Sequence, residues 1–214
     1  MDQPQLPNFI AVEGNIGAGK TTFATRLAEE RNRRLILEDF ADNPFLAPFY
    51  KEPERYAFPV ELFFMAERHK QLQAELALTD LFTTGVVADY IFVKTLLFAR
   101  NTLDEEEFRL FSRIHKTMDA GFPHPDLIVY LHRPVAVLQA NIAKRGRDYE
   151  RDMQDDYLTS VERAYLSYFG TQKDAPVLII DLGDTDFVQE PAVYGKIVDA
   201  ITGTNHVGVK TVVI

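Results

Sequence analysis

A lysine and a threonine follow closely spaced glycines near the start of the chain, where residues 13–22 read EGNIGAGKTT. This stretch contains the pattern GxxxxGK[ST] in full. In that pattern the glycines let backbone N–H groups turn toward phosphate oxygens, the lysine reaches the β- and γ-phosphates, and the hydroxyl that follows binds Mg²⁺. The stretch therefore predicts a nucleotide-phosphate site with Thr21 on the metal. The residues of this site are Gly14, Asn15, Ile16, Gly17, Ala18, Gly19, Lys20, Thr21 and Thr22.

A phosphate site of this kind needs a strand before it and a helix after it, and the sequence indicates both. Residues 9–12 (FIAV) are typical of a buried strand, and apolar residues recur at helical spacing after Lys20. Four more strands are predicted at 35–37, 85–88, 127–131 and 177–180, and the final TVVI suggests an added edge strand. Helices are expected at about 60–78, 95–100, 105–120, 134–144, 157–169 and 193–201, with a proline- and aromatic-rich connection over 43–59. Strands alternating with helices predict an α/β fold with a parallel sheet covered on both faces.

Two acidic residues stand where predicted strands end. Glu38 follows the second strand and Asp89 follows the third. The carboxyl ends of strands face the crevice in which open α/β sheets bind ligands. Glu38 is therefore a candidate to accept the proton of an attacking hydroxyl or to orient it, and Asp89 is a candidate to hold Mg²⁺. The alternative is that Glu38 is a capping or surface acid and that Asp89 is a turn acid.

Arg145 and Arg147 lie in the charged segment KRGRDYERD. Arginine side chains bind phosphate oxygens through two parallel hydrogen bonds. A basic segment that closes over a nucleotide would stabilise the charge on a phosphoryl group in transfer and would exclude water. Acids in the same segment leave open the alternative of a solvated, charged surface.

Composition limits the possible partners. The 214 residues carry a net charge of −9, which argues against a general nucleic-acid binder, because such proteins neutralise phosphates with Lys and Arg. The chain has no Cys, and its five His lack the spacing of zinc ligands. We see no signal peptide and no apolar run of about 20 residues, so a cytoplasmic protein without membrane contact is expected.

Six segments, in order along the chain, resemble the deoxynucleoside kinases, especially the bacterial deoxyadenosine/deoxyguanosine kinases. They are FIAVEGNIGAGKTT, LILEDFADNPFL, FYKEPERYAFPVELFF, VVADYIFVKTLLFARN, PDLIVYL and AKRGRDYE. The resemblance runs from about Phe9 to Phe187. It implies a P-loop α/β/α fold with a five-stranded parallel sheet, one domain over residues 1–214 and a lid at about 141–153. It also implies ATP and Mg²⁺ as cofactors, a small-molecule deoxynucleoside as substrate, and a homodimer.

The resemblance assigns roles around a deoxynucleoside. Glu38 would take the proton of the 5′-hydroxyl or orient it, and Arg145 and Arg147 would belong to the lid. Glu150 would hold the 3′-hydroxyl together with Tyr50. Phe98 would stack on the base.

The chain also departs from the family pattern. The acid at Asp89 is usually followed by an arginine that contacts the phosphate or the 5′-oxygen, but this chain has Tyr90, so another cation must replace it or the segment aligns differently. Asn141 stands where the lid often has another arginine. Glu61 falls where most members have Gln, and Arg68 lies on much the same helical face. The two residues either read a purine base, deoxyadenosine being favoured over deoxyguanosine, or form an intrahelical pair.

Three alternatives to a deoxynucleoside kinase follow from the same residues. A thymidylate-kinase-like nucleotide kinase would need basic residues to hold an acceptor phosphate, against which Glu38 and Tyr90 argue. A non-catalytic nucleotide-binding scaffold would be free to lose Lys20, Thr21 or Glu38, yet all three are present. A GTPase would read guanine with an NKxD motif, which the sequence lacks.

Overall fold

The computed structural model describes residues 6–38, 43–76, 83–147, 150 and 153–214, except for the side chain of Tyr50. The described strands are β1 (Phe9–Gly14), β2 (Arg34–Ile36), β3 (Val86–Ala88), β4 (Leu127–His132), β5 (Val177–Asp181) and β6 (Val209–Val213). The described helices are α1 (Lys20–Glu30), α2 (Leu46–Lys51), α3 (Pro53–Leu76), α4 (Lys94–Thr102), α5 (Glu105–Asp119), α6 (Val135–Arg145), α7 (Asp155–Thr171) and α8 (Pro191–Thr202).

The strands form one parallel sheet in the order β2-β3-β1-β4-β5-β6. The α/β/α prediction is confirmed, but the expected count of five strands is wrong, because β6 pairs with β5 and adds a sixth at the edge. The terminal TVVI does contribute an edge strand, as its composition suggests. β1 lies between β3 and β4, so the strands that follow β1 are placed first on one side of it, as β2 and β3, and then on the other, from β4 onward. The carboxyl end of β1 is therefore at the topological switch point where such sheets bind ligands.

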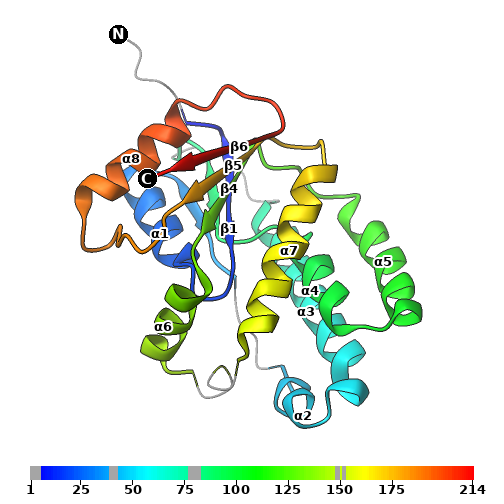
Figure 1. Cartoon of the computed structure of the whole chain (residues 1–214). Helices are drawn as coiled ribbons and strands as arrows, with labels where there is room; N and C mark the ends of the chain where they lie inside the picture. Colours follow the sequence, from blue (N-terminus) through cyan, green and yellow to red (C-terminus); the bar gives the residue numbers. More distant parts are fainter. Residues whose placement is uncertain (1–5, 39–42, 77–82, 148–149, 151–152) are drawn as a thin grey trace.

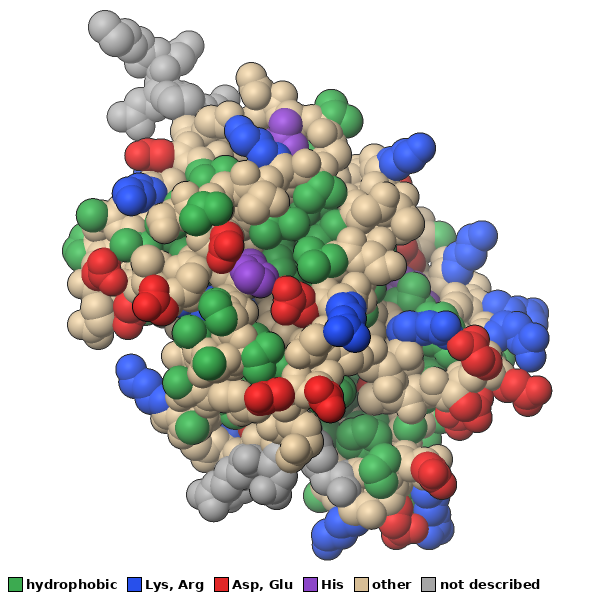
Figure 2. Space-filling model, viewed as in Figure 1, with side chains coloured by type: hydrophobic (Ala, Val, Ile, Leu, Met, Phe, Trp, Pro, Cys, Tyr) green, Lys and Arg blue, Asp and Glu red, His purple; other side chains and the backbone are tan. Residues whose placement is uncertain are grey.

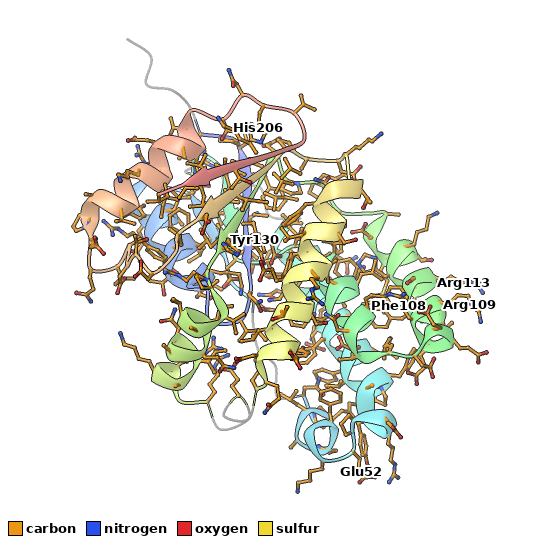
Figure 3. All side chains as sticks on the ribbon, viewed as in Figure 1. Glu52, Phe108, Arg109, Arg113, Tyr130 and His206 are labelled. Carbon is orange, nitrogen blue, oxygen red and sulfur yellow. The ribbon has the colours of Figure 1, made fainter. Side chains whose placement is uncertain are left out.

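Helices cover both faces of the sheet (Figure 1). On one face α1 and α8 pack apolar side chains such as Phe23, Leu27 and Ile197 against β1, β4 and β5. On the other face Tyr130 of β4, which Figure 3 labels, contacts the rings of Tyr165 and Phe169 on α7 at centroid distances of 5.2 and 5.3 Å. These two apolar layers hold the strand ends, and with them the loops that follow, in fixed positions.

The prediction that residues 43–59 form only a connection is wrong, because this segment contains α2 and the first residues of α3. Pro53 is the first residue of α3, where a missing N–H has no helical partner to lose. Pro59 lies inside α3 and removes one helical hydrogen bond. Ala57 and Val60 beside it are buried, and this packing compensates the local loss.

Charged side chains on the surface are mixed in sign. On the face drawn in Figure 2, Lys and Arg side chains and Asp and Glu side chains are both spread over the surface. None of the described helices combines the length and the apolar character that a membrane span requires.

Candidate active site

The segment between β1 and α1 folds as a phosphate-binding loop. Gly17 and Gly19 adopt positive φ angles of 82° and 93°. The first residue of α1 is Lys20, so the free N–H groups of the helix start face the loop. Lys20 Nζ donates to the Asn15 carbonyl at 2.9 Å, and Asn141 Nδ2 donates to the Gly17 carbonyl at 2.8 Å. Asn141 thus holds the backbone of the loop.

Gly17→Ala is expected to destabilise the protein by about 2 kcal/mol or more, since a non-glycine residue in the left-handed region costs about 1–3 kcal/mol. A Cβ at this position would also lie 2.7 Å from the Leu138 carbonyl oxygen. Urea unfolding measures the change. Gly170→Ala is the matched control, because a Cβ there meets no atom within 4 Å, and its stability should be equal or slightly higher. Equal stability of Gly17→Ala and Gly170→Ala would contradict the prediction.

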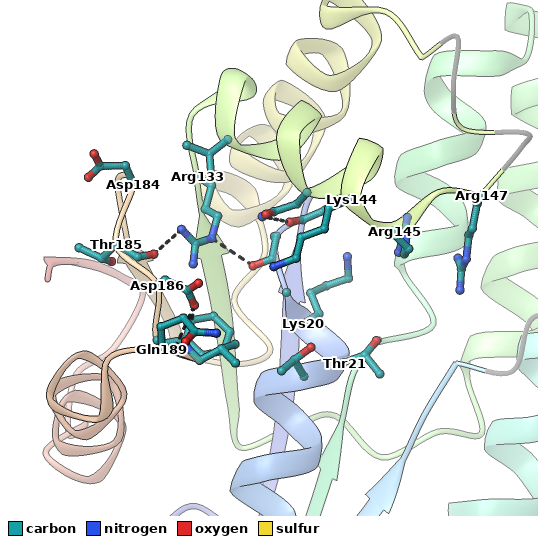
Figure 4. A pocket seen from close by; sticks show the side chains of 18 residues that line it. Lys20, Thr21, Arg133, Lys144, Arg145, Arg147, Asp184, Thr185, Asp186 and Gln189 are labelled. Carbon is teal, nitrogen blue, oxygen red and sulfur yellow. Dashed lines mark hydrogen bonds between the residues drawn. The ribbon is translucent and has the colours of Figure 1, made fainter.

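A cavity of about 550 Å³ opens beside the loop, and we call it the donor cavity. Its lining includes residues 17–22, the far end of α6 and the segment 184–189 after β5. Figure 4 shows Lys20 and Thr21 at one side and Arg145 and Arg147 opposite, all directed toward the same space. Arg133 closes the inner end, where its Nη1 donates to the Thr185 carbonyl at 2.7 Å. Lys20, Lys144 and the three arginines give this cavity the positive charge that a polyphosphate needs.

A second cavity, of about 170 Å³, adjoins the first, and we call it the acceptor cavity. Lys20, Thr21, Arg145 and Arg147 line both. The acceptor cavity is also lined by Glu38, Glu61, Arg68, Asp89, Phe98 and Glu150, which are the residues expected there from the sequence. Of the remaining expected residues, Tyr50 has its backbone in α2, but its side chain lies outside the described part of the chain.

Two cations hold the carboxylate of Glu38, whose side chain is only 6% exposed. Arg68 binds Oε1 through Nε and Nη2, both at 2.7 Å, and Lys94 Nζ binds Oε2 at 2.5 Å. Burial alone would raise the pKa of Glu38, but the charges of Lys94 and Arg68 outweigh it and hold the pKa below its ordinary value. Glu38 is therefore ionised at neutral pH. Arg68, expected beside Glu61 at the base, contacts the predicted proton acceptor instead.

Asp89 joins the end of β3 to the phosphate loop. Its Oδ2 accepts a hydrogen bond from Thr21 Oγ1 at 2.6 Å, and its Oδ1 accepts one from the Glu38 backbone N–H at 2.6 Å. The two residues expected at Mg²⁺ are thus in contact. Among the described residues, no group of three or more His, Asp or Glu side chains could hold a metal alone. Hard oxygen ligands from only two residues suit Mg²⁺, which usually completes its shell with water and substrate phosphates.

Glu61 lies deep in the acceptor cavity and accepts a hydrogen bond from Thr102 Oγ1 at 2.8 Å. Burial raises the pKa of Glu61 to about 7, although the Thr102 hydrogen bond and the charge of Arg68 lower it in part. This carboxyl group therefore changes its charge near neutral pH, unlike Glu38.

Glu150 is 5% exposed and is held by both arginines of the predicted lid. Arg145 Nη2 lies 2.5 Å from its Oε2, and Arg147 Nη1 lies 3.6 Å from its Oε1. The lid itself, residues 141–153, includes 148–149 and 151–152, which lie outside the described residues, so the lid stays a prediction.

Comparison with known proteins places the chain among phosphoryl-transfer enzymes. Residues 10–207 match the sequence profile of a family described as deoxynucleoside kinase. The chain belongs to the deoxynucleoside kinase family. It is 33% identical over 196 residues to the deoxyguanosine kinase of Bacillus subtilis (strain 168), which covers 88% of this chain and 93% of that protein. It is 27% identical over 216 residues to the deoxyadenosine/deoxycytidine kinase of the same organism, over 96% of this chain and 98% of that one.

Solved structures of this kinase family share the fold. The deoxyadenosine kinase from M. mycoides with bound dATP superposes with a TM-score of 0.75 at 20% identity, covering 91% of this chain and 99% of that chain. At this identity the match supports the architecture rather than any substrate.

Reasoning from the sequence did not identify two buried charged residues, Glu13 and Lys94. Glu13, fully buried, accepts from the Ile91 N–H at 2.8 Å and from the Tyr165 hydroxyl at 2.7 Å. It thereby ties β1 to the segment between β3 and α4 and to α7. Lys94 is the partner of Glu38 described above. A lone lysine in the apolar run FVKTLLF, shortly after a strand-ending acid, was the signal that could have found it.

Proposed function

We propose that the chain transfers the γ-phosphoryl group of ATP to the 5′-hydroxyl of a purine deoxynucleoside. The observation that carries this proposal is the border between the two cavities, where Lys20, Thr21, Arg145 and Arg147 line both. A triphosphate on the phosphate loop would point its last phosphate across this border. An acceptor in the second cavity would there meet Glu38. Membership of the deoxynucleoside kinase family supports the same reaction.

The roles of the side chains follow from charge. Lys20 faces the β- and γ-phosphates, and Arg145 and Arg147 stabilise the charge that develops on the phosphoryl group during transfer. The ionised Glu38 aligns the 5′-hydroxyl and accepts its proton as the bond to phosphorus forms. Thr21 and Asp89 would hold Mg²⁺, which would neutralise phosphate charge when bound. Glu150, together with Tyr50, binds the 3′-hydroxyl once Arg145 no longer holds the Glu150 carboxylate.

A nucleotide kinase is less well supported by the acceptor cavity. It would place an acceptor phosphate beside the cations Arg68 and Lys94, but these two are paired with the Glu38 carboxylate, whose negative charge would repel that phosphate. The groups that transfer would need also argue against a scaffold without activity, since Lys20, Thr21 and Asp89 line the acceptor cavity together and Thr21 is bound to Asp89. A homodimer remains an expectation from the family resemblance.

Base preference should depend on pH through Glu61. Below pH 7 a protonated carboxyl can donate to N1 of adenine and accept from its amino group. Above pH 7 the ionised carboxylate only accepts, which suits the paired N1–H and N2–H donors of guanine. We therefore expect deoxyadenosine to be favoured at pH 6, and the ratio of kcat/KM for deoxyguanosine to that for deoxyadenosine to rise by up to about tenfold between pH 6 and 8, as the group passes through its pKa.

The measurement is a set of kcat/KM values for both nucleosides across that pH range. Glu61→Gln should flatten the ratio, since an amide does not titrate there, while Glu54→Gln, an exposed change on the same helix, should keep it. A ratio that rises equally in Glu61→Gln would contradict the assignment.

The reaction itself is tested with radiolabelled ATP and Mg²⁺ against deoxyadenosine, deoxyguanosine, deoxycytidine, thymidine and dAMP in parallel. Labelled 5′-monophosphate from a purine deoxynucleoside is the expected product. Transfer to dAMP alone would establish a nucleotide kinase instead, and ATP binding without transfer to any acceptor would support a scaffold.

A further inference from the structure

The position after Asp89 supplies no cation to the active site. Tyr90 is fully buried, its hydroxyl donates to Gln71 Oε1 at 2.8 Å, and it is not among the residues that line the acceptor cavity. Its ring lines a different cavity, which lies among α3, α5 and the segment before β4. The cation that the resemblance expects beside the phosphate must therefore come from another residue.

Lys94, the first residue of α4, brings a cation to the acceptor cavity. Its side chain is 7% exposed, lines the acceptor cavity and reaches Glu38 Oε2. An ammonium group has three N–H donors. Within the described residues the structure gives Lys94 Nζ one hydrogen-bond partner, Glu38, so two donors remain for a ligand. Arg68 has two nitrogens fixed on one oxygen of Glu38, and its third, Nη1, is buried without a hydrogen-bond partner among the described residues.

Lys94 and Lys20 serve the same region, because both line the acceptor cavity. Lys20 also lines the donor cavity, so a γ-phosphoryl group at the border of the two cavities would lie where both ammonium groups can reach it.

We propose that Lys94 is the cation that bridges Glu38 to the transferring phosphoryl group. The inference rests on the proposed function. Lys94 holds the carboxylate toward the 5′-hydroxyl with one N–H and donates another to a γ-phosphoryl oxygen. In the transfer the 5′-oxygen forms a bond to the γ-phosphorus, the bond from that phosphorus to the bridging oxygen breaks, ADP leaves, and the hydroxyl proton passes to Glu38. A compact ammonium on a flexible stem can serve both groups at once.

The first test compares Lys94→Met and Lys94→Arg with the wild-type protein. Lys94→Met should lower kcat by about 10²–10³-fold, the usual effect of losing one donor to a developing charge, with less than a threefold change in nucleoside KM. Lys94→Arg should recover at least about tenfold of that loss, since it restores a donor of positive charge. Lys196→Met, an exposed lysine of α8, should keep wild-type kinetics.

A binding test separates this inference from the reaction itself. Affinities for ADP with aluminium fluoride, a mimic of the transferring phosphoryl group, and for ADP alone are measured by calorimetry with Mg²⁺. Lys94→Met should weaken the mimic tenfold or more and leave ADP unchanged. This outcome would support Lys94 even if the wild-type protein phosphorylated no nucleoside. Equal binding of the mimic by both proteins would overturn the role.

Folding must be controlled, because Lys94→Met leaves Glu38 with one cation. The double variant Lys94→Met/Glu38→Gln removes both charges and should regain thermal stability lost in the single variant, while its affinity for ADP with aluminium fluoride stays low. Recovery of that affinity in the double variant would show that Lys94 serves only to neutralise Glu38, and the inference would fail.

Discussion

Glu38→Gln is expected to lower kcat by about 10²–10⁴-fold, the range attributed to a positioned proton acceptor. The amide keeps the shape of the side chain but has no negative charge to receive the 5′-hydroxyl proton. It also leaves Lys94 and Arg68 without their common counter-ion, at a site where the Glu38 side chain is 6% exposed. Initial rates with ATP and the best deoxynucleoside give kcat, and calorimetry gives ATP affinity, which should change little.

A measurement of the stability of Glu38→Gln separates a loss of catalysis from a loss of folded protein. Removing one partner of a buried charge group costs about 3–5 kcal/mol, so the melting temperature should fall as well. Rates are therefore measured well below the transition. Glu29→Gln, an exposed change on α1, should match the wild-type protein in both rate and stability. A Glu38→Gln protein with kcat within threefold of wild type would remove Glu38 from the proposed reaction.

Lys20→Met should reduce kcat/KM by about 10²–10³-fold, because it removes a preorganised donor to the phosphates. Lys20 lines both cavities. In this structure its Nζ donates a hydrogen bond of 2.9 Å to the carbonyl oxygen of Asn15, which belongs to the same loop. Unlike Glu38→Gln, the change should not lower the melting temperature. Burial and the nearby Lys94 lower the pKa of Lys20 to about 8, so its charge is a cost to the folded state.

The comparison needs rates, ATP affinity and thermal unfolding of the same preparations. Lys196→Met serves as the control for loss of one lysine, since its side chain is exposed on α8. If Lys20→Met kept its activity, the phosphate loop would only hold the nucleotide, and the transfer would have to be stabilised by other groups.

Local sequence patterns were enough to predict much of the secondary structure and the phosphate loop of this protein. The phosphate loop, β1 and α1 are contiguous, so glycine spacing and apolar runs predict them with their order. The parallel sheet and the strand-ending acids Glu38 and Asp89 follow from the same kind of pattern. Even β6 at the edge was visible in the composition of the last residues, although the family resemblance implied five strands.

The tertiary structure alone decided which charges meet. Arg68 and Lys94 reach Glu38 from positions 30 and 56 residues away, on different helices. Periodicity assigns a residue to a face of its own helix but does not say which residue of another element lies opposite. The pairing of Arg68 with Glu38 instead of Glu61, the turn of Tyr90 away from the site, and the cation that Lys94 provides there all depend on how α3 and α4 pack beside β3. For that reason the sequence located the site, and the packing of helices against the sheet decided its electrostatics.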